Sequence, residues 1–383
     1  MKSFLQVYYQ QILFFIFISC IIVFRIQIEK YQYITPDSIE YLTAARNLLQ
    51  GNGAKSTSGT FFSYWPLAYP SLIALTSKIT HIEVIWASKI LNLFLLGISI
   101  ILINILFNKN TNLPVFYFGS YSLLEIYSHT WSECLSTPLL LLYIYTIIQI
   151  SKNGSNWIFT SLLIISLFGL NLTRYSSFIY LVINLFFTIY FWNKIDNKTN
   201  KHFIISTTLS TFLVLAYLTF NYFQVGHPTG HPRSVVFPTE VNTIIQKFIF
   251  ETSNLLFIAK KINFLTLIDS ILFIIINGVQ AILCYLTFKN IKIKINQKLK
   301  IILIITFIYF GFVFFTHFII QKVSFDDRIL VGFSAPIYFY LLHICETQLI
   351  ENNKIKLLNY IKVFLFFSAI FNLPKQYLID LLF

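Results

Sequence analysis

The sequence predicts an all-α integral membrane protein with about eleven transmembrane helices. Hydrophobic residues make up 56% of the chain and charged residues only 11%, whereas a soluble domain has about 25% charged residues. Apolar runs of about 20 residues recur along the chain, the length that an α-helix needs to cross a bilayer. Lysines gather between these runs, where the positive-inside rule places them. The formal charge of +13 therefore reflects membrane topology, and we expect no nucleic-acid partner.

We expect one polytopic membrane domain over residues 1–383. The predicted spans lie near 8–28, 84–107, 113–128, 132–151, 156–172, 175–192, 203–223, 264–288, 300–320, 329–346 and 358–372. Segment 66–80 is a separate case, because it begins with two prolines among aromatic residues and is short for a span. We interpret it as an interfacial or re-entrant helix.

The charge of the loops supports this interpretation. With the N-terminus in the cytoplasm and 66–80 not crossing, nearly every short lysine-rich loop falls on the cytoplasmic side. Counting 66–80 as a span would place Lys289–Lys300 outside. The outer face then carries a first outer loop at 29–82, with interfacial helices, and a second large outer loop at 224–263. Every polar cluster suited to chemistry falls on this outer face.

The chain has neither a Walker-type loop nor a dinucleotide-binding fingerprint. An active site that faces away from cytoplasmic nucleotides needs a lipid-borne or otherwise pre-activated substrate. We therefore expect an outward-facing site in an integral membrane protein, with the bacterial inner (cytoplasmic) membrane as its location.

The longest polar interruption is the stretch 35–70, which reads TPDSIEYLTAARNLLQGNGAKSTSGTFFSYWPLAYP. Apolar residues recur at helical spacing over 37–50 and predict a short amphipathic helix. Gly51 and Gly53 follow it and end it, as glycine does after a helix C-terminus. Trp65 begins the return to the membrane surface, where aromatic side chains anchor. An acid held at the bilayer surface by such a loop indicates interfacial chemistry.

This stretch resembles the first outer loop of the GT-C glycosyltransferases. The pattern D-x-x-x-Y-x-x-x-A-x-x-L-x-x-G runs from Asp37 to Gly51, and an aromatic-Pro-x-x-Tyr-Pro return runs from Trp65 to Pro70. Protein O-mannosyltransferases and lipid A aminoarabinose transferases belong to this class. The resemblance implies transfer of a sugar from a polyprenyl-phosphate donor to a lipid, glycan or protein acceptor on the non-cytoplasmic face. It leaves a divalent metal open as a cofactor.

Two acids are the candidate catalytic residues. The resemblance implies that Asp37 is the base that takes the acceptor proton, although Ser38 stands where a second acid often follows. Glu133, in SHTWSECLSTP, matches the recurring acid of the second outer loop and would orient the acceptor or bind a metal. The alternative for both acids is a favourable charge at a helix N-terminus. His129 is a weaker candidate, and Lys89 is expected to snorkel from its span without a function.

Three arginines and two first-loop residues are candidates for binding the donor phosphate. Arg174 lies in GLNLTRYSS, and a cation so close to the membrane needs a partner, either an acid or a phosphate. Arg233 ends the turn-rich segment GHPTGHPR, whose alternative is an ordinary loop. Arg328 ends the SFDDR turn, which resembles the late D-R-Y-x-x-P element of GT-C chains or forms a self-neutralising surface turn. Lys55 and Tyr69 share the first outer loop with the candidate base.

Two other function classes remain as alternatives. An outer-face polysaccharide polymerase also has many spans and arginine-bearing outer loops, but it centres its chemistry on a large later loop. A non-enzymatic transporter or lipid flippase would place charged residues or broken helices near the bilayer midplane. The position of the ionisable residues therefore discriminates between them, because a cavity at the outer end favours the transferase.

Overall fold

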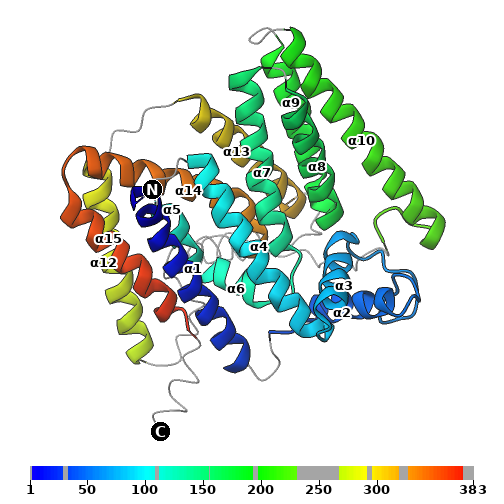
Figure 1. Ribbon diagram of the computed structural model, residues 1–383, viewed down its shortest axis with the longest axis horizontal. Coiled ribbons are helices and arrows are strands. Elements are labelled where there is room, and N and C mark those ends of the chain that lie inside the picture. Colours follow the sequence, from blue (N-terminus) through cyan, green and yellow to red (C-terminus); the bar gives the residue numbers. More distant parts are fainter. Residues whose placement is uncertain are drawn as a thin grey trace.

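Helices account for nearly all of the structure, a computed structural model that describes residues 2–28, 33–107, 112–154, 156–192, 197–230, 267–290, 296–318 and 327–373 (Figure 1). Within these ranges no strand forms, and a single isolated bridge joins Lys55 to Phe61. The helices are α1 Lys2–Ile28, α2 Pro36–Leu49, α3 Ala68–Thr80, α4 Val84–Phe107, α5 Leu113–Phe116, η1 Tyr117–Gly119, α6 Tyr121–Ser128, α7 Glu133–Asn153, α8 Trp157–Thr173, η2 Tyr175–Phe178, α9 Ile179–Phe191, α10 Asn197–Val225, α12 Leu267–Asn290, α13 Gln297–Phe318, α14 Asp327–Glu351 and α15 Ile355–Phe371.

The helices confirm an all-α integral membrane fold. In the described part of the chain, five are long and apolar enough to cross a bilayer: Tyr8–Ile28, Val84–Phe107, Glu133–Lys152, Thr199–Val225 and Gln297–Thr316. Helix α8 and the segment Tyr175–Phe191 are shorter apolar helices, and α12, α14 and α15 occupy the remaining predicted spans. Large apolar side chains stay exposed on the outside of the bundle, where lipid rather than water is the expected neighbour.

The predicted span 113–128 is not one helix. It is divided into α5, η1 and α6, and nearly all of its side chains are buried inside the protein. Pro114 opens α5, and a Cβ on Gly119 would lie 3.2 Å from the Cβ of Ala369, so α15 passes close to the break. Backbone that leaves the helical path at membrane depth is tolerated where protein surrounds it. The prediction of one membrane-spanning helix at 113–128 is therefore wrong, because hydropathy does not tell an apolar run enclosed by protein from one that faces lipid.

The first outer loop folds as its sequence predicts. Thr35 caps α2, its Oγ1 accepting from the Ser38 backbone N–H at 3.3 Å, and Pro36 occupies the first turn. Gly51 and Gly53, which follow the helix, have φ of 75° and 74°, a region that favours glycine. Helix α3 has 13 residues and rises about 20 Å, too little for a hydrocarbon core of about 30 Å. It packs against α2 and α4 at one end of the bundle (Figure 1).

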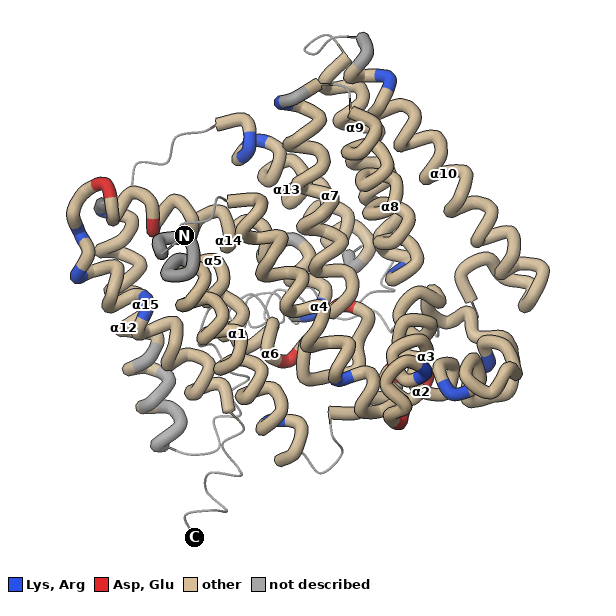
Figure 2. Tube along the Cα trace, in the orientation of Figure 1, with Lys and Arg blue, Asp and Glu red and all other residues tan. Residues whose placement is uncertain are grey.

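A few contacts show which loops lie together at each end of the bundle. At one end, Lys298 Nζ donates to Leu106 O at 2.6 Å, so the start of α13 meets the end of α4. At the other end, Tyr175 Oη donates to Ser63 O at 2.9 Å, and Gly230 packs against the Ser63 backbone. Figure 2 shows charged residues near helix ends, with long uncharged stretches between them. The assignment of one end to the cytoplasm stays a prediction, and residues 231–263 of the second outer loop lie outside the described residues.

Candidate active site

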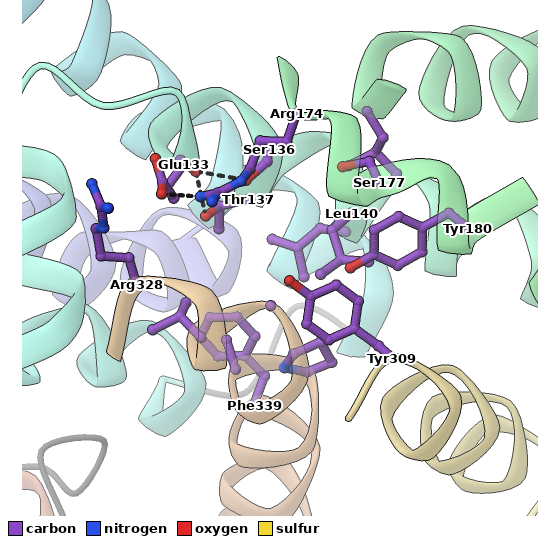
Figure 3. A pocket seen from close by; sticks show the side chains of 16 residues that line it. Glu133, Ser136, Thr137, Leu140, Arg174, Ser177, Tyr180, Tyr309, Arg328 and Phe339 are labelled. Atoms are coloured by element: carbon purple, nitrogen blue, oxygen red, sulfur yellow. Dashed lines mark hydrogen bonds and ion pairs between the residues drawn. The ribbon is translucent and has the colours of Figure 1, made fainter. Parts of the chain in front are cut away.

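Four charged side chains from four separate elements form two ion pairs at the α2–α3 end of the bundle. Asp37 lies in the first turn of α2, Glu133 begins α7, Arg174 follows α8, and Arg328 lies at the start of α14. Figure 3 shows Glu133, Arg174 and Arg328 around one cavity. The structure therefore brings together four of the seven predicted site residues, although the Asp37–Arg328 pair is 291 positions apart in the sequence.

The first pair joins Arg174 Nη1 to Glu133 Oε1. Helices α7 and α8 pack together as consecutive elements, so the start of α7 lies beside the end of α8. Arg174 has an extended backbone there (φ −150°, ψ 136°), which turns its side chain out of the helical path. The Glu133 side chain is 8% exposed and that of Arg174 20%. Burial is the largest single influence and lowers the pKa of the Arg174 guanidinium, but Glu133 and two nearby tyrosines together raise that pKa by more, so the net pKa is raised and the group stays charged.

The second pair joins Arg328 Nη1 to Asp37 Oδ2 at 3.1 Å. The side chains are 21% and 29% exposed, so this pair is more open than the first. The Arg328 guanidinium also lies 4.6 Å from the ring centroid of Trp131, within the range of a cation–π contact.

Helix α2 is attached to the turn that precedes α7 by side chains of its first two turns. Tyr41 Oη donates to Ser132 Oγ at 3.1 Å, and Ser38 Oγ donates to Thr130 O at 3.2 Å. Because Tyr41 lies one helical turn after Asp37, the D-x-x-x-Y spacing places the acid and its anchor on one face. This contact explains why the candidate base approaches the start of α7.

The cavity has a charged mouth and an apolar wall. Glu133, Arg174 and Arg328 lie at the mouth together with small hydroxyl side chains. The wall is apolar, formed by Leu140, Leu141, Leu170, Val331, Pro336 and Phe339. The enclosed space is about 30 Å³, room for one or two water molecules, so a larger ligand needs the side chains at the mouth to move.

One wall of the cavity depends on a glycine that the sequence analysis did not single out. Tyr309 stacks on Tyr180 with centroids 5.5 Å apart, and its hydroxyl donates to Ile329 O at 3.2 Å. A Cβ on Gly332 would lie 3.0 Å from both Cζ and Oη of Tyr309. Gly332 therefore permits the close approach of α13 and α14 beside the cavity. Its place in the ILVGFSAPIY segment just after Arg328 was the available signal.

The other predicted site residues lie elsewhere. Tyr69 is fully buried, donates to Asn92 Oδ1 at 2.7 Å and does not line the cavity. Lys55 is exposed in the first loop, where it forms the isolated bridge to Phe61. Arg233 is outside the described residues. Among the residues that the structure describes, no group of three His, Cys, Asp or Glu could hold a metal ion, so the metal alternative gains no ligand set here.

Lys89 and His129 differ from their simplest sequence interpretations. Lys89 does not snorkel: it is 4% exposed, and its Nζ donates to Ser128 O at 2.7 Å. The His129 side chain is only 13% exposed, lying 3.4 Å from a Glu125 carboxylate oxygen. Burial lowers the pKa of His129 to about 4, although Glu125 opposes the change. Glu125 also pairs with Arg25 of α1, a buried ion pair that the sequence analysis missed.

No family model and no curated protein sequence matches this chain. A solved structure does: the crystal structure of ArnT from Cupriavidus metallidurans bound to undecaprenyl phosphate, with a TM-score of 0.57 over 92% of this chain at 10% identity. The chain has a GT-C fold. The resemblance that the first outer loop predicted is thereby confirmed at the level of fold. The chain spans 63% of the length of the ArnT chain that it matches.

Proposed function

We propose that this protein is a membrane glycosyltransferase that takes a sugar from a polyprenyl-phosphate donor. The observation that carries the proposal is the cavity itself, with Arg174 and Arg328 at its mouth and an apolar wall behind them. A polyprenyl phosphate has the same two parts, an anionic head and an apolar tail. The fold shared with ArnT, which was crystallised with undecaprenyl phosphate, supports the same ligand class.

The arginines suit the phosphate because a planar guanidinium binds phosphate oxygens through two parallel N–H donors. Each arginine has a carboxylate partner in the structure. A bound phosphate would replace or share these carboxylates, since both anions use the same N–H edge of the guanidinium. Donor binding would in this way leave Asp37 able to accept a proton.

The proposed reaction is an inverting displacement. A hydroxyl or amine of the acceptor attacks the anomeric carbon of the donor sugar while the bond from that carbon to the phosphate oxygen breaks. Asp37 takes the proton that the nucleophile loses, and Glu133 orients the acceptor. The bonding electrons leave with the lipid phosphate, whose negative charge the two arginines stabilise.

The position of the charged groups favours this reaction over transport. All four lie at or near helix ends, in the first turn of α2, at the starts of α7 and α14, and after the end of α8. A transporter would place such groups along a path at the bilayer midplane. The acceptor, which can be a lipid, a glycan or a protein, would approach from the non-cytoplasmic face of the bacterial inner membrane. An outer-face polysaccharide polymerase would centre its chemistry on a large later loop, whereas Asp37 of the proposed site lies in the first loop.

Transfer of labelled sugar from polyprenyl-phosphate donors in reconstituted liposomes tests the proposal, with wild type and Asp37→Asn compared. We expect transfer by the wild type and at least a hundredfold lower rate for a folded Asp37→Asn protein, the usual contribution of a general base. Transfer that survives the substitution would remove Asp37 from the role of base. Absence of transfer with every donor would favour transport, which flux assays then measure.

A further inference from the structure

Trp131 lies in the turn between α6 and α7, two residues before Glu133. Its ring lies 4.6 Å from the Arg328 guanidinium carbon. Its indole Nε1–H donates to Thr35 Oγ1 at 2.9 Å. Its ring also stacks on His129, with centroids 3.9 Å apart and planes 7° from parallel. One side chain thus joins its own turn to two segments that are far from it in the sequence.

Both members of the Asp37–Arg328 pair depend on these contacts. Thr35 is the N-cap of α2, and Asp37 follows it by two residues, so the indole N–H helps to place the start of that helix. Arg328 contacts the indole ring directly. Trp131 therefore contacts the cation itself and the cap of the helix that carries the anion.

The chemistry of a guanidinium explains the value of an aromatic partner at this position. An arginine has a long flexible side chain, and Asp37 holds its N–H edge in the structure. A donor phosphate must use that same edge. An aromatic ring attracts the guanidinium through its face and does not compete for the N–H donors. The ring contact can consequently persist while the carboxylate is exchanged for phosphate.

We propose that Trp131 is a positioning residue that holds Arg328 at the mouth of the cavity for the donor phosphate. The inference rests on the proposed function, because it assigns Trp131 a role only through the phosphate-binding arginine. It explains why a tryptophan lies two residues before the α7 carboxylate: the turn that leads to Glu133 also supports the second arginine.

His129 supports this arrangement from beneath the indole. Its pKa is lowered to about 4 by burial, so it is neutral at physiological pH and brings no positive charge near Arg328. The charged groups that face it are Glu125 of α6, Arg25 of α1 and Lys89 of α4. The two cations favour the neutral ring and Glu125 opposes them.

The test is a double-mutant cycle on binding of undecaprenyl phosphate by the full-length protein in nanodiscs. We expect Trp131→Leu to weaken binding about tenfold, the size of a cation–π contact in a partly desolvated site. Trp131→Phe keeps an aromatic face without the N–H, and we expect it to recover most of the affinity. In an Arg328→Gln background, Trp131→Leu should change binding less than twofold, because its effect passes through the arginine.

A matched control is Trp157→Leu, because Trp157 also contacts a histidine ring, that of His202, with centroids 4.9 Å apart, but begins α8. It should leave binding unchanged.

Equal losses from Trp131→Leu with and without Arg328 would overturn the proposal, since a general structural effect is additive. Unchanged binding in Trp131→Leu would overturn it as well. If the wild type does not bind undecaprenyl phosphate at all, both the proposed function and this inference are wrong. If Trp131→Leu does not fold, the cycle is run with Trp131→Phe, where a smaller loss must still vanish without Arg328.

Discussion

Replacing Glu133 by Gln should separate the structural role of the Glu133–Arg174 pair from its proposed role in donor binding. The substitution keeps the size and polarity of the side chain and removes its negative charge. Arg174 then remains mostly buried, with a side chain 20% exposed, without its carboxylate partner. The same change removes an anion that would compete with a donor phosphate for the guanidinium.

The two effects have opposite signs. Removing one partner of a buried ion pair lowers the free energy of unfolding by about 3–5 kcal/mol. Because Arg174 is partly exposed, we expect a loss of about 2–3 kcal/mol here. Undecaprenyl phosphate should bind the variant about fivefold more tightly, which adds about 1 kcal/mol to the stabilisation that the lipid gives at a fixed concentration. Thermal unfolding in detergent, with and without the lipid, measures both quantities, and the transfer assay should show a loss of activity.

An exposed pair in the same chain supplies the control. Arg46 and Glu83 are 3.1 Å apart with side chains 45% and 58% exposed, so Glu83→Gln should change stability by less than about 1 kcal/mol and leave lipid binding unchanged. If Glu133→Gln lowers stability but the lipid stabilises it no more than it stabilises the wild type, Arg174 does not bind the phosphate. A variant as stable as the wild type would contradict the buried ion pair itself.

Three further predictions concern stability. The free energy of unfolding should fall by about 3 kcal/mol as the pH drops from 6.5 to 4, because His129 binds a proton in the unfolded state but, with its pKa lowered to about 4 by burial, largely does not in the folded state. Unfolding measured as a function of pH should show this loss, and the substitution His129→Phe should remove most of the pH dependence. Gly332→Ala should lower the free energy of unfolding by about 1–3 kcal/mol and weaken lipid binding, since the added Cβ would lie 3.0 Å from Tyr309. If calorimetry finds no loss of stability, α13 and α14 can move apart without cost. Glu346→Gln should lower the free energy of unfolding by about 3 kcal/mol, because Lys362, 3.1 Å away, loses its buried carboxylate partner. Lipid binding should not change, because Glu346 lies near the end of α14 that is remote from Arg328.

The parts of the fold that local chemistry specifies were predictable from the sequence. The helical spacing of apolar residues over 37–50 and the two glycines that follow placed α2 correctly, and the apolar run 84–107 coincides with α4. The segment 113–128 was different, because an apolar run looks alike whether lipid or protein surrounds it. Only the packing of α15 against Gly119 shows that this run is enclosed and broken.

The candidate site shows a similar division. Asp37, Glu133, Arg174 and Arg328 could each be recognised, since a charge beside a membrane span is costly and needs a reason. Their pairing could not be predicted, because each acid had several possible cations at unknown distances. Trp131 was not recognised for a related reason: an aromatic residue at a membrane interface is common, and its contact with Arg328 joins distant segments.

By itself, the sequence determined the membrane class, most of the apolar helices, the first-loop helix and the charged residues that lie near helix ends. These follow from local quantities: transfer free energies of side chains, helix capping and the charge of loops. Only the tertiary structure decided that the acids and arginines form two pairs, that one cavity joins them to an apolar wall, and that Trp131 connects α2 to α14. The reason is physical: contacts between distant segments depend on how the side chains of several helices close-pack together, and no single stretch of sequence encodes that packing.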